Sequence, residues 1–211
     1  MIKATVINQF SDLIMNCEKN IIGKILDGRL ETEPDITNRF LQSIEDTFEN
    51  GKNIDDVKFL ARTLKDRGSD SAERKFGADI CGILDINIQG YQITKGFLIQ
   101  AKYDRQLSII KNGAIHFTSS KNSEIYRQSQ DMLNITYESY IMIYNKLGFK
   151  ICKADNIGQK IIEGDSVNLF FTDLLSCKRG DRDLVSHSNE MLEKLKQRTK
   201  SHNGLEIFVN K

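Results

Sequence analysis

Three polar side chains lie at the ends of two apolar runs near the middle of the sequence. Asp79 opens the first run, which continues through residues 80–86, and Gln100 and Lys102 close a second run about twenty residues later. Because side chains alternate between the faces of a strand, Gln100 and Lys102 point the same way. A carboxylate, an amide oxygen and an ammonium at one edge of a hairpin favour a site for a hard metal ion and a phosphate.

The same residues also have a purely structural interpretation. In that interpretation Asp79 caps the start of a strand, and the aliphatic stem of Lys102 lies along a sheet edge with its ammonium in solvent. An ammonium at the end of a buried strand is costly unless something there uses it. Spacing alone leaves both interpretations open.

Composition indicates an ordinary globular protein. The chain has 211 residues, and 30 Lys and Arg nearly balance 29 Asp and Glu. This balance argues against a protein that coats polyanions, but it leaves room for a basic patch that binds nucleic acid. Four cysteines without C-x-x-C spacing predict neither a zinc ribbon nor a disulfide framework. We expect a reduced, cytoplasmic chain with no signal peptide, no membrane span and no membrane partner.

The apolar pattern predicts an α/β protein with a mixed central sheet flanked by helices. Three- and four-residue apolar spacing predicts helices at residues 3–26, 34–49, 55–65, 121–134, 166–176 and 188–199. Apolar runs between turn residues predict strands at residues 78–88, 91–103, 140–144, 150–154 and 205–209. The helix at 121–134 separates two strands, as in a crossover connection.

We expect one domain over residues 1–211. Its parts are an N-terminal helix at 1–28, a core at 30–155 and a C-terminal helical extension at 156–211. A chain of this length can bury one sizeable core.

Gly77-Ala78-Asp79, the apolar strand and Ile99-Gln100-Ala101-Lys102 resemble the PD-(D/E)xK nuclease superfamily. The Q-x-K form is similar to that of Mrr-like restriction endonucleases. The resemblance implies a restriction endonuclease-like core of order αβββαβ, here with an N-terminal helical extension. It also implies cleavage of DNA, less often RNA, with Mg²⁺ or Mn²⁺. Two departures are that no proline precedes Asp79 and that Gln100 stands in place of an acid.

The resemblance also implies a role for each residue. Asp79 would be the metal-binding acid, Gln100 would take the place of the second acid, and Lys102 would be the catalytic lysine. Because a neutral amide binds metal less strongly than a carboxylate, a further acid is needed. Many members of this superfamily add a glutamate from the helix before the first strand, and Glu33 matches that role best.

Rival interpretations of these acids stay open. Glu31 and Glu45 are weaker candidates for the added glutamate, and Glu33 would otherwise serve only to stabilise a helix dipole. The resemblance also implies a catalytic role for Gln130, on the helix after the lysine strand, although Gln130 equally fits a solvated helix face. In the polar segment at residues 69–75, Glu73 is a candidate ligand or simply part of a solvated connection.

The leading hypothesis is a metal-dependent endonuclease that hydrolyses DNA, with duplex DNA as its substrate. It would suit a restriction or anti-phage defence effector, acting as a homodimer or with partner subunits. The alternative is a catalytically inactive nuclease-like module that binds nucleic acid or protein, with Gln100 as a step towards inactivity. A third option is a structural or immunity partner that docks through its N-terminal helix.

Overall fold

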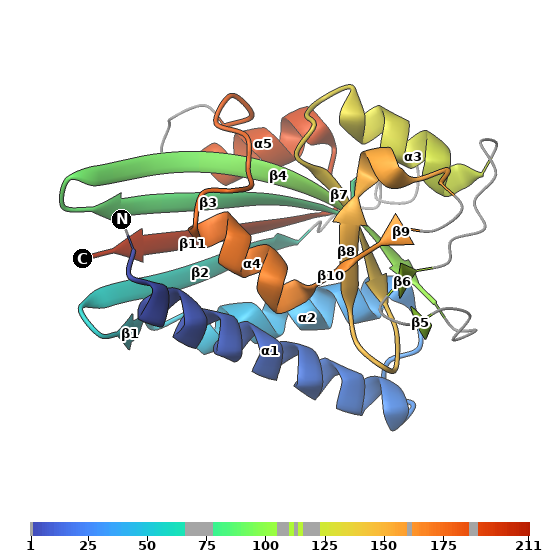
Figure 1. Cartoon of the computed structure of the whole chain (residues 1–211), viewed down its shortest axis with the longest axis horizontal. Coiled ribbons are helices and arrows are strands. Elements are labelled where there is room, and N and C mark those ends of the chain that lie inside the picture. Colours follow the sequence, from blue (N-terminus) through green and yellow to red (C-terminus); the bar gives the residue numbers. More distant parts are fainter. Residues whose placement is uncertain are drawn as a thin grey trace.

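An eight-stranded mixed sheet forms the centre of the molecule (Figure 1). The computed structural model describes residues 2–65, 78–104, 110–111, 114–115, 123–159, 162–185 and 190–211. In these residues the strand order of the sheet is β1-β2-β11-β3-β4-β7-β8-β10, and β5, β6 and β9 form a smaller sheet. The α/β class predicted from the sequence is therefore confirmed.

The elements have the following bounds. The helices are α1 (Ala4–Leu26), α2 (Glu33–Phe48), α3 (Glu124–Leu133), α4 (Val167–Leu175) and α5 (Met191–Thr199), with a short 3₁₀ helix at Ala154–Asn156. The large sheet contains β1 (Lys52–Ile54), β2 (Val57–Lys65), β3 (Ile80–Ile88), β4 (Tyr91–Tyr103), β7 (Ser139–Tyr144), β8 (Lys150–Lys153), β10 (Asp165–Ser166) and β11 (Asn203–Asn210). The small sheet contains β5 (Ile110–Lys111), β6 (Ala114–Ile115) and β9 (Ile162–Glu163).

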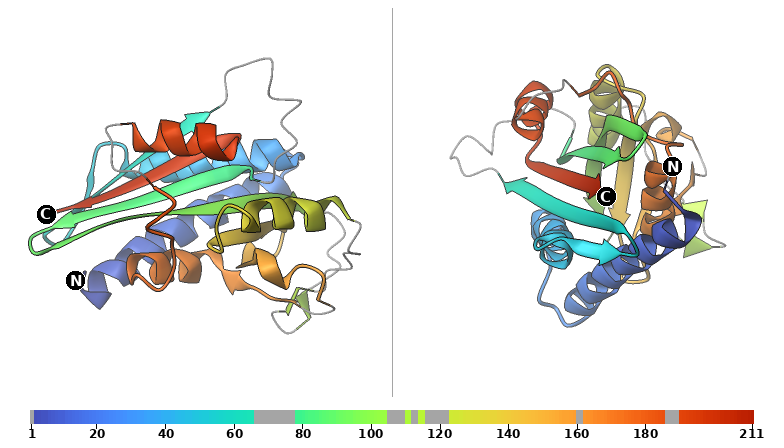
Figure 2. Two further views of the ribbon diagram at one scale, coloured as in Figure 1. Left: turned by 90° about the horizontal axis from the view of Figure 1, so that it is seen from above. Right: turned by 90° about the vertical axis from the view of Figure 1, so that its left-hand side faces the viewer.

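Helices cover both faces of the sheet, and each face has its own apolar cluster. Side chains of α1, α2 and α4 pack into the larger cluster, and side chains of α3 and α5 pack into the other. Figure 2 shows α1 and α2 on the opposite side of the sheet from α5. Among the described helices, none combines the length and apolar character that a membrane crossing requires.

Local sequence explains where α2 begins. Thr32 is its N-cap and accepts a hydrogen bond of 3.4 Å from the amide of Asp35. Pro34 occupies the first turn, where a missing N–H costs nothing. The acids Glu33 and Asp35 complement the positive end of the helix dipole. The helix predicted at residues 34–49 is thus confirmed with a shift of one residue at each end.

The predicted hairpin and crossover are also confirmed. β3 and β4 pair antiparallel, with Ile88 opposite Tyr91, so that the turn falls at Gln89-Gly90. Gly90 has a φ of 75°, which suits glycine in a tight turn. After β4 the chain returns through α3 to β7, which pairs parallel to β4. A parallel pair needs such a crossover.

The helix predicted at residues 55–65 was wrong, because this segment forms β2. Its apolar residues fit helical spacing, but Val57, Phe59 and Ala61 are buried in strict alternation. β1 and β2 form a hairpin in which Ile54 pairs with Val57. The other edge of β2 pairs with β11, which is distant in sequence. Tertiary pairing therefore overrides the helical pattern.

The C-terminal segment at residues 156–211 is more than the helical extension that we expected. It contains α4 and α5, as predicted, but its last strand lies inside the large sheet. β11 pairs antiparallel with β2 and parallel with β3 (Figure 1). The last described strand is therefore a central strand of the large sheet, hydrogen-bonded to β2 on one side and to β3 on the other.

Candidate functional site

The main chain of Asp79 lies between the ends of two strands. Its amide donates to the carbonyl of Ile99 on β4 over 3.0 Å, and its carbonyl accepts from the amide of Asn203 on β11 over 2.8 Å. Because Asp79 immediately precedes β3, these bonds fix it at the end of the sheet. The position of its carboxylate is set by three strands at once.

Asp79 and Gln100 are brought together as predicted. Oδ2 of Asp79 accepts one hydrogen bond from the amide of Ala101 over 2.8 Å and another from Nε2 of Gln100. Nε2 of Gln100 also donates to the carbonyl of Ala101 over 3.2 Å. Gln100 is only 3% exposed. It therefore presents its amide nitrogen to Asp79 and holds that carboxylate in place.

Glu33 and Lys102 meet at the same end of the sheet. Oε1 of Glu33 lies 3.6 Å from Nζ of Lys102, and Oε2 accepts from the amide of Tyr103 over 2.9 Å. Both charged side chains are 27% exposed, so that this ion pair is partly shielded from water. The first turn of α2 is thereby tied to the end of β4, and a second carboxylate joins the site.

The surroundings of Asp79 raise the pKa of its carboxyl group. Burial raises the pKa of Asp79 to about 6, and the negative charge of Glu33 adds to this rise. The amide of Ala101, the ammonium of Lys102 and the amide of Gln100 oppose it. A cation beside Asp79 would favour its ionised form and so oppose this rise in pKa.

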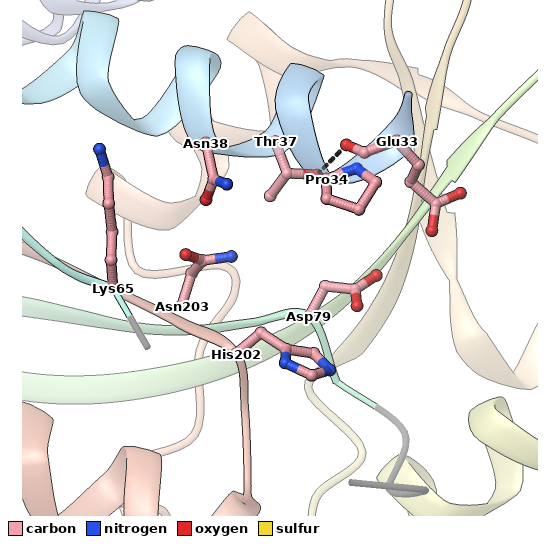
Figure 3. Close-up of a pocket in the computed structure, with 8 residues that line it drawn as sticks. All are labelled: Glu33, Pro34, Thr37, Asn38, Lys65, Asp79, His202 and Asn203. Atoms are coloured by element: carbon pink, nitrogen blue, oxygen red, sulfur yellow. Dashed lines mark hydrogen bonds between the residues drawn. The ribbon is translucent and has the colours of Figure 1, made fainter. Parts of the chain in front are cut away.

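A pocket of about 380 Å³ opens beside these groups (Figure 3). It is lined by Glu33, Pro34, Thr37, Asn38, Lys65, Asp79, His202 and Asn203. Glu33 and Asp79 lie at one end, and the amides of Asn38 and Asn203 face each other across the other end. α2 forms one wall, and the ends of β2, β3 and β11 form the other.

Sequence reasoning missed six of these lining residues: Pro34, Thr37, Asn38, Lys65, His202 and Asn203. No motif spacing links His202 to Asp79, which is more than a hundred residues away. The two become neighbours because β11 runs parallel to β3, with Asn203 opposite Ile80. The sequence does place polar residues just before the last predicted strand, but these residues do not indicate which strand pairs with it.

Gln130 is placed apart from the pocket. It is exposed on α3, and it is not among the pocket residues. The buried residues of α3 are Ile125, Ser129 and Met132, which point to the sheet. The structure thus gives Gln130 the position of a solvated helix residue, and its catalytic role stays a prediction.

The rivals of Glu33 are also placed elsewhere. Glu45 accepts hydrogen bonds of 2.8 Å from both the amide and the hydroxyl of Thr63, so it ties α2 to β2. Glu31 is exposed before the helix and does not line the pocket. Glu73 lies outside the described residues.

The carboxylate end of the pocket suits a hard divalent ion. Both bonds to Asp79 engage Oδ2, and in the described part of the chain Oδ1 accepts none. Mg²⁺ retains several waters and is usually held by one or two carboxylates rather than by a full protein cage. Among the described residues no group of three or more His, Cys, Asp or Glu side chains could hold a metal. Asp79 and Glu33 are two carboxylates that line the same pocket, which is the number that Mg²⁺ commonly takes from a protein.

Models of known protein families, curated proteins and solved structures give no match to this chain. The structure itself defines an α/β protein with a mixed sheet, at one end of which two carboxylates and a lysine meet beside a pocket. What these groups can do follows from their chemistry.

Proposed function

We propose that this protein is a metal-dependent endonuclease that hydrolyses phosphodiester bonds of DNA. The observation that carries the proposal is that Glu33 and Asp79, from separate segments, line one end of a pocket, and that Lys102 from a third segment pairs with Glu33. Paired carboxylates for a divalent ion, with a cation beside them, suit reactions at a phosphate. No local feature of the sequence requires Glu33 to lie beside Lys102, and their proximity supports a shared role.

The order of elements also supports the proposal. α2, β2, β3, β4, α3 and β7 come in the αβββαβ order that the sequence resemblance implies, with the short strands β1 before β2 and β5 and β6 before α3 as additions. Asp79 lies at the start of the second of these strands, and Lys102 near the end of the third. β11 departs from a simple sequential sheet, because it lies between the first and second strands of this core.

Each residue has a distinct task in this proposal. Asp79 and Glu33 would hold Mg²⁺ or Mn²⁺, which lowers the pKa of a bound water and offsets negative charge on the phosphate. Lys102 places its ammonium where it can stabilise a phosphate oxygen or orient the attacking water. Gln100 keeps Oδ2 of Asp79 occupied, so that the carboxylate cannot rotate freely.

We further propose that the protein acts in restriction or anti-phage defence. One site of this kind cuts one strand, so a double-strand break needs a homodimer or a partner subunit that contributes a second site. The four cysteines of the chain are free, which suits a reducing, cytoplasmic compartment.

A cleavage assay tests the proposed chemistry. Purified protein with Mg²⁺ or Mn²⁺ should cut plasmid and single-stranded DNA, and Lys102→Met should lower the rate by at least about 100-fold, as loss of one key electrostatic group does. Lys153→Met is the matched control, because Lys153 also pairs with one glutamate at similar exposure, but that glutamate, Glu138, does not line the pocket. Equal rates for Lys102→Met and Lys153→Met would contradict the proposal.

One observation favours the alternative of an inactive binding module. Gln100 brings no charge to the site, and its amide nitrogen already occupies an oxygen of Asp79. Titration calorimetry with Mg²⁺ separates the two functions. An active nuclease should bind the ion in a manner that Asp79→Asn abolishes, whereas an inactive module should show no Asp79-dependent binding.

A further inference from the structure

The end of the pocket away from the carboxylates contains polar groups that have no hydrogen-bond partner among the described residues. The side chains of Asn38, Asn203 and His202 form no hydrogen bond with any other residue that the structure describes. Asn203 is only 8% exposed, so its amide has little access to solvent outside the pocket. Asn38 is half-buried, and the side chains of both asparagines line the pocket, so that their amides are candidates to bind a ligand there.

The two ends of the pocket differ in this respect. At the carboxylate end, Glu33 is paired with the amide of Tyr103 and Asp79 with that of Ala101. At the other end, Asn38 from α2 points toward Asn203 from β11 across open space (Figure 3). A pocket in which a few polar groups converge is typical of small-ligand recognition.

We propose that this end of the pocket binds the base of one unpaired nucleotide of the substrate. The inference rests on the proposed function, which places a phosphate near Glu33 and Asp79. The base attached to that phosphate then reaches Asn38 and Asn203. Each side-chain amide offers one donor and one acceptor group, which match the edge of a base.

The surrounding residues fit the same ligand. Pro34 offers an apolar surface beside the amides, and His202 stands between the amide end and Asp79. Lys65 is exposed at the rim, where its ammonium donates to Oε1 of Gln42 over 2.8 Å and adds positive charge beside the pocket. The volume of about 380 Å³ lies near the lower end of the range of about 300–1,000 Å³ for small-ligand pockets, which suits one nucleotide.

The position of the pocket restricts the form of the substrate. It lies between α2 and the strand ends, so that a base must leave its stack to enter. Enzymes that take a base into a pocket act on single strands or extrude the base from a duplex. We therefore infer that the protein prefers single-stranded DNA, or DNA with an unpaired nucleotide at the cleavage position, over the paired duplex that the sequence suggested.

Binding of deoxynucleoside monophosphates to the whole chain, measured with EDTA present, tests the pocket without any cleavage. They should bind at least tenfold more tightly than inorganic phosphate. Asn38→Ala and Asn203→Ala should each weaken nucleotide binding by at least tenfold and leave binding of inorganic phosphate unchanged. Asn168→Ala is the control, because Asn168 lies on α4 and does not line the pocket. Nucleotide binding no tighter than that of phosphate, or insensitive to both variants, would overturn the inference.

Cleavage rates separate this inference from the proposed function. The protein should cut single-stranded DNA at least tenfold faster than a fully paired duplex, and folded Asn38→Ala should lose this preference. Equal cleavage of both substrates, without nucleotide binding, overturns the pocket inference and leaves the nuclease standing. Nucleotide binding without cleavage of any DNA overturns the nuclease and leaves the base-binding pocket standing.

Discussion

The amide of Asn203 donates a hydrogen bond of 2.8 Å to the carbonyl oxygen of Asp79. This bond joins the last strand of the chain to the residue on which the candidate site depends. It aligns β11 with β3 and places His202 beside the carboxylate of Asp79. The start of β11 therefore contributes to the site together with the β3–β4 hairpin.

Removing the negative charge of Asp79 should stabilise the fold above pH 6. The pKa of Asp79 is about 6 in the folded protein against 3.8 ordinarily, so the native state holds its proton more tightly than the unfolded chain. The free energy of unfolding therefore falls as the pH rises from about 4 to about 6. At pH 7.5, Asp79→Asn should be more stable than wild type by roughly 1–3 kcal/mol, since about two pKa units correspond to about 3 kcal/mol at most.

Urea denaturation of both proteins at pH 4, 6 and 7.5 measures this difference. The difference should be much smaller at pH 4, where the carboxyl is protonated in the folded state and partly protonated in the unfolded state, because its ordinary pKa is 3.8. Asp183→Asn is the control, because Asp183 is exposed away from the pocket, and it should leave the wild-type pH profile unchanged. A difference that grows towards low pH would show that the pKa of Asp79 is lowered instead.

Neutralising Glu33 should weaken binding of divalent ions. Glu33→Gln keeps the shape of the side chain but leaves a single carboxylate, Asp79, at that end of the pocket. We expect Mg²⁺ affinity to fall at least tenfold, or about 1.4 kcal/mol. Glu45→Gln is a control on the same helix, since Glu45 is bonded to Thr63. Calorimetry that gives equal Mg²⁺ affinities for the two variants would exclude Glu33 as a ligand.

Truncating a buried side chain of β11 should lower the free energy of unfolding. Ile207 is 1% exposed and lies on the strand between β2 and β3, so Ile207→Ala should cost about 2–5 kcal/mol. Leu147 is 70% exposed, and Leu147→Ala should change stability by less than about 0.5 kcal/mol. Thermal unfolding compares the two. Similar melting temperatures would mean that β11 is dispensable.

Two glycine substitutions should have opposite effects. A Cβ on Gly82 would overlap the ring of Phe97, its partner on β4, so Gly82→Ala should destabilise the hairpin by about 1–3 kcal/mol. Gly23 lies within α1, with nothing near its missing Cβ, so Gly23→Ala should stabilise by about 0.5–1 kcal/mol. Chemical denaturation measures both, and an equal sign for the two would refute this explanation.

Local patterns were enough to predict α1, α2 and the β3–β4 hairpin. The apolar spacing of α1, the cap and proline of α2 and the Gln89-Gly90 turn are signals within one element. The strand in residues 55–65 was not predicted, because the apolar residues of this segment fit both a helix and a strand. Only pairing with β11, contributed by the far end of the chain, decides between the two.

The sequence by itself determined the α/β class and the pairing of Asp79 with Gln100, because both residues belong to one hairpin. It also supplied Glu33 as a candidate through a resemblance, but nothing local required Glu33 to contact the end of β4. Tertiary structure decided that contact, the exposed place of Gln130 and the arrival of His202 and Asn203 at the pocket. The physical reason is that hydrogen bonds between distant strands fix these positions, and strand register leaves no mark in local spacing.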